Sequence, residues 1–360
     1  MSLLDVLKTR MQQDGPLTVA EYMEAALADP EFGYYKGRDP LGRGGDFTTS
    51  PEISQMFGEV LGLWCAIAWD QMGQPSNINL VEIGPGRGTL MHDMVRAAGT
   101  LPGFKESLAI HLVETSPVLK ERQKSALAHL DQSVTWHESV ETLPDGPLVI
   151  IANEFFDALP IKQFVRTDTA WHERMVGLED DGLCFGITPL PAPQDGPGNK
   201  AHLVGEKGAI AETCPVGEAI CNELASRLVQ FGGTALFIDY GYGTPALGDS
   251  LQAVKGHAYH PVLETPGEAD LTAHVDFDAL AQAARRAGAN AYGVLPQGTF
   301  LRRLGIEARA QILSRKATDE QRDDIAMTLK RLIHEDEMGN LFKVLALTHP
   351  AQPTPPGFDD

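Results

Sequence analysis

The sequence has few cysteines and no cysteine pair with the spacing of a metal site. Its four cysteines, Cys65, Cys184, Cys214 and Cys221, are scattered, and none belongs to a Cys-x-x-Cys motif. Structural zinc sites and redox-active dithiols usually depend on such pairs, so we expect neither. We interpret all four as reduced structural thiols, which is typical of a cytoplasmic protein.

Basic residues are scarce relative to acidic ones. The 360-residue chain has 29 Lys and Arg against 49 Asp and Glu, a formal net charge of −20, and it has no long basic run. A nucleic-acid-binding surface needs clustered positive charge, so we expect no nucleic-acid partner. The acidic excess instead favours attraction of a basic partner.

Long apolar runs are missing as well. No stretch approaches the roughly 20 apolar residues that a membrane-spanning helix needs. Residues 1–10 have neither the features of a signal peptide nor the Arg-rich, acid-free composition of a transit peptide. We therefore expect no membrane insertion and a cytoplasmic location.

The chain does contain a strand pattern that stops in a glycine cluster. The apolar residues at 80, 81 and 83 suit a buried parallel strand, and Gly84, Gly86 and Gly88 then allow a sharp turn with no side chain in the way of a ligand. Apolar residues at 90, 91, 94 and 95 then follow at the spacing of a helix. A second apolar strand ends in Glu114, whose carboxylate can accept both hydroxyls of a ribose. The pattern predicts a nucleoside-binding βαβ unit.

The spacing of the glycines indicates which nucleoside. A dinucleotide fingerprint is Gly-x-Gly-x-x-Gly, but Thr89 occupies the place of its third glycine. Glu82, two residues before Gly84, instead matches the first motif of class I methyltransferases that use S-adenosylmethionine (SAM). We therefore favour SAM over a dinucleotide or a purely structural glycine turn.

A second group of polar residues follows another apolar strand. Residues 148–152 are uninterrupted apolar and run into Asn153, Glu154 and Asp157. Ligands of open α/β sheets bind outside the carboxyl ends of the strands, so we expect these side chains to face the same crevice as the glycine turn.

The patterns in the remaining segments divide the chain into three parts. Residues 1–76 are expected to form N-terminal helices and a lid-like glycine-rich loop, with a plain surface linker as the alternative for the loop, and Ser50 and Pro51 are expected to start the helix after it. Residues 77–349 form the predicted core, with insertions at about 162–210 and 242–273. Residues 350–360, with four prolines, are expected to be a disordered tail.

Five ordered motifs resemble the MidA-like family of class I SAM-dependent methyltransferases, which includes the mitochondrial complex I assembly factor that dimethylates an arginine. The resemblance spans about Pro16 to Thr348. The motifs are Gly45–Glu59, Val81–Gly88, Asn153–Pro160, Asp270–Phe277, and Met338–Gly339 with Phe342–Leu345.

The resemblance implies a seven-stranded, mostly parallel class I sheet with SAM as cofactor. It also implies a protein substrate with an accessible arginine, such as a subunit of respiratory complex I. Because residues 1–10 do not look like a transit peptide, the chain resembles a bacterial-type member.

The predicted site residues fall into two groups. For cofactor binding we predict Glu82, Gly84, Gly86, Gly88, Glu114 and Asn153. For catalysis we predict Glu154 first, because carboxylates can bind the donors of a guanidinium, and then Asp157, Asp46 and His274. His274 would accept the proton lost after transfer.

A purely structural role remains an alternative for most of the predicted catalytic residues and for Asn153. Asn153 and Glu154 can form a helix N-cap pair, Asp157 can be a first-turn acid, Asp46 can cap a loop, and a turn can hold His274. Two other functions also remain, a nicotinamide-dependent oxidoreductase and a non-catalytic assembly factor that keeps the SAM fold.

Overall fold

The structure is a computed structural model that describes residues 2–37, 49–99, 101–180 and 182–359. The described chain forms two compact units. The first unit holds the described residues of Met1–Phe47, Phe156–Ala219 and Thr244–Ala279, and the second holds those of Thr48–Phe155, Ile220–Gly243 and Leu280–Asp360. Both insertions expected from the sequence therefore lie mainly in one unit with the N-terminal helices, whereas residues 49–76 lie with the predicted core.

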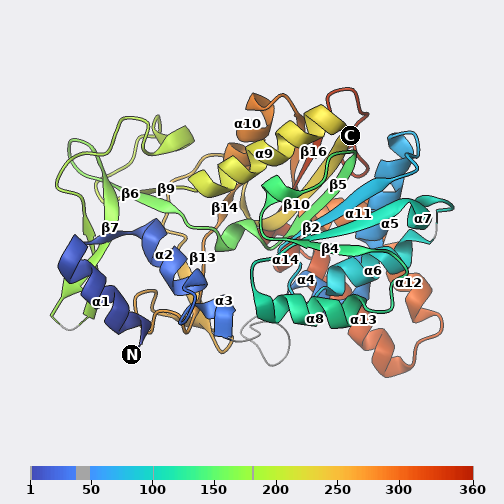
Figure 1. Ribbon diagram of the computed structural model, residues 1–360, viewed down its shortest axis with the longest axis horizontal. Coiled ribbons are helices and arrows are strands. Elements are labelled where there is room, and N and C mark those ends of the chain that lie inside the picture. Colours follow the sequence, from blue (N-terminus) through green and yellow to red (C-terminus); the bar gives the residue numbers. More distant parts are fainter. Residues whose placement is uncertain (1, 38–48, 100, 181, 360) are drawn as a thin grey trace. The chain divides into compact units, whose positions relative to one another are not determined.

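A sheet of seven strands forms the centre of the second unit (Figure 1). Its strands lie in the order β15 (Asn290–Pro296), β16 (Phe342–Thr348), β10 (Gly233–Tyr242), β5 (Leu148–Asn153), β2 (Ile78–Ile83), β3 (Leu108–Val113) and β4 (Val134–His137). β16 is antiparallel to both of its neighbours, and every other pair on this path is parallel. The predicted mostly parallel class I sheet is confirmed, and the described part of this unit contributes seven of the eight strands of the sheet.

The register of the central strands brings their carboxyl ends together. Ile83 at the end of β2 pairs with Val113 of β3 and with Ala152 of β5. Because these strands are parallel and adjacent, the residues that follow them emerge at one edge of the sheet. The glycine turn, Glu114 and Asn153 therefore share that edge, as the sequence predicts.

Helices cover the sheet of the second unit. They are α4 (Ser50–Ile53), α5 (Gln55–Gln71), α6 (Thr89–Ala98), α7 (Phe104–Ser107), α8 (Pro117–Leu127), α11 (Gln297–Arg303), α12 (Ile306–Ser314), α13 (Asp319–Ile333) and α14 (Met338–Leu341). One core cluster joins Trp64 of α5 and Met94 of α6 to Leu80 of β2 and Ile151 of β5. Burying these large apolar side chains supplies the main driving force for this unit.

The helix expected to start at Ser50 is interrupted, and its N-cap is Thr49 rather than Ser50. Ser54 adopts an extended conformation, with φ −160° and ψ 134°, and its side chain accepts a hydrogen bond from the N–H of Met56. Ser54 thereby caps a second helix, so the expected single helix becomes the short α4 followed by α5.

The expectation of a disordered tail also differs from the structure. The Nε1–H of Trp64 donates to the carbonyl of Pro356 at 3.1 Å, and the Phe358 ring lies 5.4 Å from that of Phe300. A proline-rich composition alone did not reveal these contacts, because their partners lie far away in the sequence.

The first unit combines two antiparallel sheets with N-terminal helices. Its larger sheet follows β1 (Leu17–Thr18), β7 (Trp171–Glu179), β6 (Lys162–Arg166) and β9 (Ile210–Thr213), with β8 (Gly182–Ile187) on β7. The smaller sheet holds β12 (Ala258–His260), β11 (Gln252–Lys255) and β13 (Asp270–Thr272). β6 and β7 pair as an antiparallel hairpin, with Phe164 opposite Glu173 and Arg166 opposite Trp171.

The helices of the first unit are α1 (Leu3–Asp14), α2 (Val19–Ala28) and α3 (Tyr34–Gly37), and the boundary between units falls inside α9 (Pro215–Phe231) and α10 (Phe277–Arg286). The predicted capping box of Thr18 and Glu21 begins α2. No helix among the described residues is both long and apolar enough to span a membrane.

Candidate functional site

The glycine turn after β2 is made by three residues with positive φ. Gly84, Gly86 and Gly88 have φ of 65°, 52° and 84°. The N–H of Gly84 donates to the carbonyl of Val113 at 3.1 Å. A Cβ on Gly84 would lie 2.9 Å from the Phe155 ring, so this position needs glycine on steric as well as conformational grounds. The turn thus presents bare backbone at the sheet edge.

Glu82 lies buried on the strand that leads into this turn, with only 3% of its surface exposed. Its carboxyl accepts a hydrogen bond from the N–H of Met91 in the first turn of α6, and burial raises its pKa to about 8. The N-cap of α6 is Gly88, which has no side chain to cap the helix. Glu82 therefore supports the start of α6, and its predicted contact with a cofactor stays a prediction.

Glu114 lies at the end of β3, where a ribose-binding acid is predicted. Its Oε1 accepts from the N–H of Ser116 at 2.7 Å, and its Oε2 accepts from Nε2 of Gln123 at 3.1 Å. Burial raises the pKa of this carboxyl, although the two hydrogen bonds favour its ionised form. The backbone of Thr115 also bonds to this carboxyl. A carboxylate has about four acceptor sites, so capacity for a ligand hydroxyl remains.

Gln123 connects Glu114 to the glycine turn. Its Nε2 also donates to the carbonyl of Gly86 at 2.8 Å, and its Oε1 accepts from Nε1–H of Trp136 at 2.9 Å. The residue is fully buried. Because three hydrogen bonds fix its amide, Gln123 holds the turn and the predicted ribose acid in one relative position.

Asn153 and Glu154 follow β5 at the same edge of the sheet. Oε1 of Glu154 accepts from the backbone N–H of Ser50 at 2.8 Å and from Nδ2 of Asn153 at 3.0 Å. Glu154 has φ of 50°, which a non-glycine residue adopts only when its surroundings hold it there. The short 3₁₀ helix η2 (Phe156–Ala158) follows, but Phe155 separates it from this pair, so the N-cap alternative for Asn153 and Glu154 is wrong.

The buried Asp239 of β10 fixes the turn that carries Glu154. Its Oδ2 accepts from the N–H of Phe155 at 3.1 Å, and its Oδ1 accepts from the N–H of Tyr240 at 2.9 Å. The sequence identifies Asp239 only as an acid at the end of a strand. Its position beside β5 gives it a supporting role for Glu154.

The short helix α4 is linked to the glycine turn. Oγ1 of Thr89 donates to Oε1 of Glu52 at 2.5 Å, and Nη1 of Arg87 lies 3.8 Å from Oε2 of Glu52. Together with the bond from Ser50 to Glu154, this link places α4 beside both predicted motifs. Glu52 is also the acidic residue of the first turn of α4.

The other predicted catalytic residues lie outside the described part of the second unit. Asp157 and His274 belong to the first unit. The carbonyl of Asp157 accepts from the N–H of Ala273, and the N–H of His274 donates to Oγ of Ser250, both at 2.9 Å. Asp46 lies outside the described residues, as does most of the predicted lid. Catalytic roles for these three residues stay predictions.

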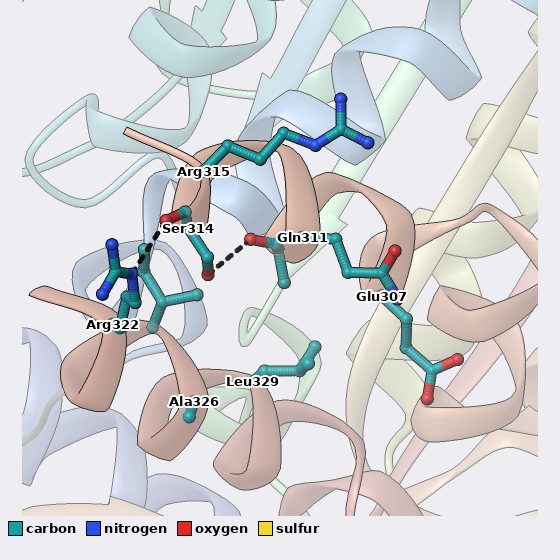
Figure 2. Close-up of a pocket in the computed structure, with 9 residues that line it drawn as sticks. Glu307, Gln311, Ser314, Arg315, Arg322, Ala326 and Leu329 are labelled. Atoms are coloured by element: carbon teal, nitrogen blue, oxygen red, sulfur yellow. Dashed lines mark hydrogen bonds between the residues drawn. The ribbon is translucent and has the colours of Figure 1, made fainter. Parts of the chain in front are cut away.

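A separate groove lies between α12 and α13 of the second unit (Figure 2). It encloses about 750 Å³, and its lining includes Glu307, Arg315 and Arg322. Nε of Arg322 donates to the carbonyl of Ser314 at 3.1 Å across it. None of the nine lining residues belongs to the predicted site, so the candidate site remains the edge formed by the glycine turn, Glu114 and residues 153–154.

This edge suits a nucleoside bound to an amino acid. The bare backbone of the turn allows close approach, and Glu114 offers acceptors for ribose hydroxyls. Buried Asn153 and half-buried Glu154 offer oxygen atoms for a positively charged nitrogen. SAM has ribose hydroxyls and a positively charged α-ammonium group, so the hydrogen-bonding groups at this edge fit it.

Comparison with known proteins identifies similar chains along nearly the whole length. Residues 60–295 match a family of S-adenosyl-L-methionine-dependent methyltransferases. "Protein arginine methyltransferase NDUFAF7, mitochondrial" of Danio rerio is 38% identical over 98% of this chain and 88% of its own, and the Homo sapiens protein of that name is 36% identical over 96% and 83%. A crystal structure of a Burkholderia thailandensis protein bound to S-adenosyl-homocysteine has a TM-score of 0.84 and 28% identity, covering 99% of this chain and 92% of that one.

Proposed function

The chain belongs to the MidA-like family of class I SAM-dependent methyltransferases, and we propose that its methyl acceptor is an arginine side chain of a partner protein. The observation that carries this proposal is the carboxylate of Glu154, fixed by Ser50 and Asn153 beside the glycine turn. Curated relatives named protein arginine methyltransferases support it. The net charge of −20 favours a basic partner.

The residues of the site mainly hold and orient the reactants. When bound, SAM supplies a methyl group on a positively charged sulfur, open to in-line attack by a nitrogen. Glu154 binds the acceptor guanidinium through charge-assisted hydrogen bonds and localises its positive charge away from the attacking nitrogen. Phe155, packed against Gly84, shields this edge from water.

The proposal extends to the partner and the compartment. We include a subunit of respiratory complex I as a partner, following the resemblance of the motifs, and we place the protein in the cytoplasm. All four cysteines are free thiols, which supports a reducing compartment.

A labelled-methyl experiment tests the acceptor. The purified protein, SAM with an isotopically labelled methyl group, and extract of cells that lack this protein are incubated together, and the labelled residues are identified by mass spectrometry. We expect methylarginine in one or a few proteins, absent with Glu154→Gln and retained with Glu141→Gln, an exposed glutamate of the same unit. Label on another residue type, or no label with the unaltered protein, would overturn the proposal.

A further inference from the structure

Two deeply buried oxygen atoms beside Glu154 have no hydrogen-bond partner among the described residues. They are Oγ of Ser50 and Oδ1 of Asn153. Ser50 is fully buried, and Asn153 is 7% exposed. Buried polar atoms in folded proteins are nearly always hydrogen-bonded, so two exceptions next to one carboxylate need an explanation.

The orientation of the Asn153 amide follows from its neighbour. A carboxylate oxygen only accepts hydrogen bonds, so the group of Asn153 that lies 3.0 Å from Oε1 of Glu154 must be its Nδ2. The amide oxygen consequently points away from that carboxylate. Ser50 is arranged similarly, because its backbone N–H donates to the same Oε1 and its hydroxyl is left over.

These leftover atoms define what a ligand must offer. An amide oxygen can only accept, so the ligand needs N–H or O–H donors. The adjacent Glu154 carboxylate favours a positive charge on the donor. A protonated amine or a guanidinium meets both conditions.

We propose that Ser50 Oγ and Asn153 Oδ1 join Glu154 to form a binding site for a positively charged N–H group. Two sources supply this chemistry in the reaction proposed above, on which the inference rests. One is the α-ammonium group of the cofactor, and the other is the guanidinium of the acceptor arginine. Ser50 is thereby a ligand-binding residue, supplied by a helix outside the glycine and strand-end motifs.

Calorimetric titrations of Ser50→Ala and Asn153→Leu distinguish the two sources. S-adenosylhomocysteine carries the α-ammonium group, whereas 5′-methylthioadenosine shares the nucleoside and sulfur but lacks the amino-acid part. If the site binds the ammonium, affinity for S-adenosylhomocysteine falls about tenfold, as expected for one charge-assisted hydrogen bond, and affinity for methylthioadenosine is unchanged. If it binds the guanidinium, both affinities are unchanged, and binding of Nα-acetylarginine amide to the protein saturated with S-adenosylhomocysteine weakens by a similar factor.

Thr348→Val is the matched control. Its Oγ1 is equally buried and without a partner among the described residues, but it lies at the amino end of the parallel strands, beside Thr234. Ser50→Ala removes one oxygen and keeps the bond to Glu154, so it remains informative if Asn153→Leu does not fold. Unchanged affinity for all three probes, or equal loss for both nucleosides, would overturn the inference. The ammonium result needs no methyl acceptor, so it stands or falls separately from arginine methylation.

Discussion

Gln123 carries the arrangement of the cofactor site at the scale of single residues. It bonds to Gly86 of the turn, to Glu114 and to Trp136 while fully buried. Gln123→Leu keeps a similar volume but leaves the Trp136 N–H and the Gly86 carbonyl without this partner. We expect it to weaken binding of S-adenosylhomocysteine by about tenfold or more, measured by calorimetry.

Ser125→Ala on the same helix is the control for Gln123. Its exposed hydroxyl donates only to the carbonyl of Glu121, so cofactor affinity should not change. A Gln123→Leu protein that binds S-adenosylhomocysteine as tightly as this control would contradict the role given to Gln123.

Residues could be predicted from the sequence where their position depends only on a short stretch of neighbouring residues. The glycines and Glu114 stand at set distances from strand patterns, and each lies where predicted. Ser50 bonds to Glu154 from 104 positions away, and Asp239 bonds to the neighbouring Phe155 from 84 positions away, so no local pattern reveals either contact. Gln123 could have been recognised from the sequence as a buried polar residue, since it lies four positions from both Leu119 and Leu127 on the buried face of α8.

At the scale of elements, two glycines of α5 let it pack closely against α6. A Cβ on Gly62 would lie 2.6 Å from the carbonyl oxygen of Met94, and one on Gly58 would lie 2.5 Å from Cβ of Asp93. Alanine is the better helix former by about 1 kcal/mol. Gly62→Ala should nevertheless lower the free energy of unfolding by about 1–3 kcal/mol, because backbone atoms cannot move aside cheaply.

Urea denaturation measures this effect, with Gly99→Ala at the end of α6 as the control. A Cβ on Gly99 would meet only the carbonyl of Arg96, at 4.0 Å, so this variant should be neutral or slightly stabilising. Equal stability of the two variants would show that α5 and α6 are not in such close contact.

Elements were predicted well where one residue marks their start. Capping boxes at Thr18 and Thr318 begin α2 and α13, and the carboxylate of Asp276 accepts from the N–H of Ala279 at the start of α10. The break at Ser54 was missed because Ser50-Pro51-Glu52 is itself a strong start signal and the apolar periodicity continues through both helices. Only tertiary contacts, such as those of Glu52 and Ser50, select a short α4.

At the scale of the whole molecule, the buried Glu82 links stability to pH. Burial raises its pKa from 4.5 to about 8, so the folded state keeps a proton that the unfolded state loses above its ordinary pKa. The unfolded state then binds fewer protons, and the free energy of unfolding should fall as pH rises from about 4.5 to about 8. Glu82→Gln should remove this decline, measured by urea denaturation at several pH values.

Glu335→Gln provides the comparison for Glu82. It removes an exposed carboxyl from the same unit, and the pH dependence of stability should match that of the unaltered protein. A decline that persists unchanged in Glu82→Gln would mean that Glu82 is ionised in the folded state at neutral pH.

The class of the whole fold was predictable, but its division was not. The resemblance of the five motifs implied the seven-stranded sheet, and continuous apolar runs such as 148–152 predicted individual buried parallel strands within it. The grouping of residues 162–210 with the N-terminal helices depends on pairing such as Leu17 with Val176, which is set by packing and not by neighbours in sequence. The prediction of a disordered tail was wrong for the same reason, because its contacts are with residues far away in the sequence.

The most direct test of the account is titration of the purified protein with S-adenosylhomocysteine, alongside Gly86→Val. Gly86 has φ of 52°, and a β-branched side chain there would both strain the backbone and block the bare turn. We predict micromolar binding by the unaltered protein and none by the variant, with both proteins folded by circular dichroism. Equal binding by the two, or no binding by either, would contradict a cofactor site at this edge of the sheet.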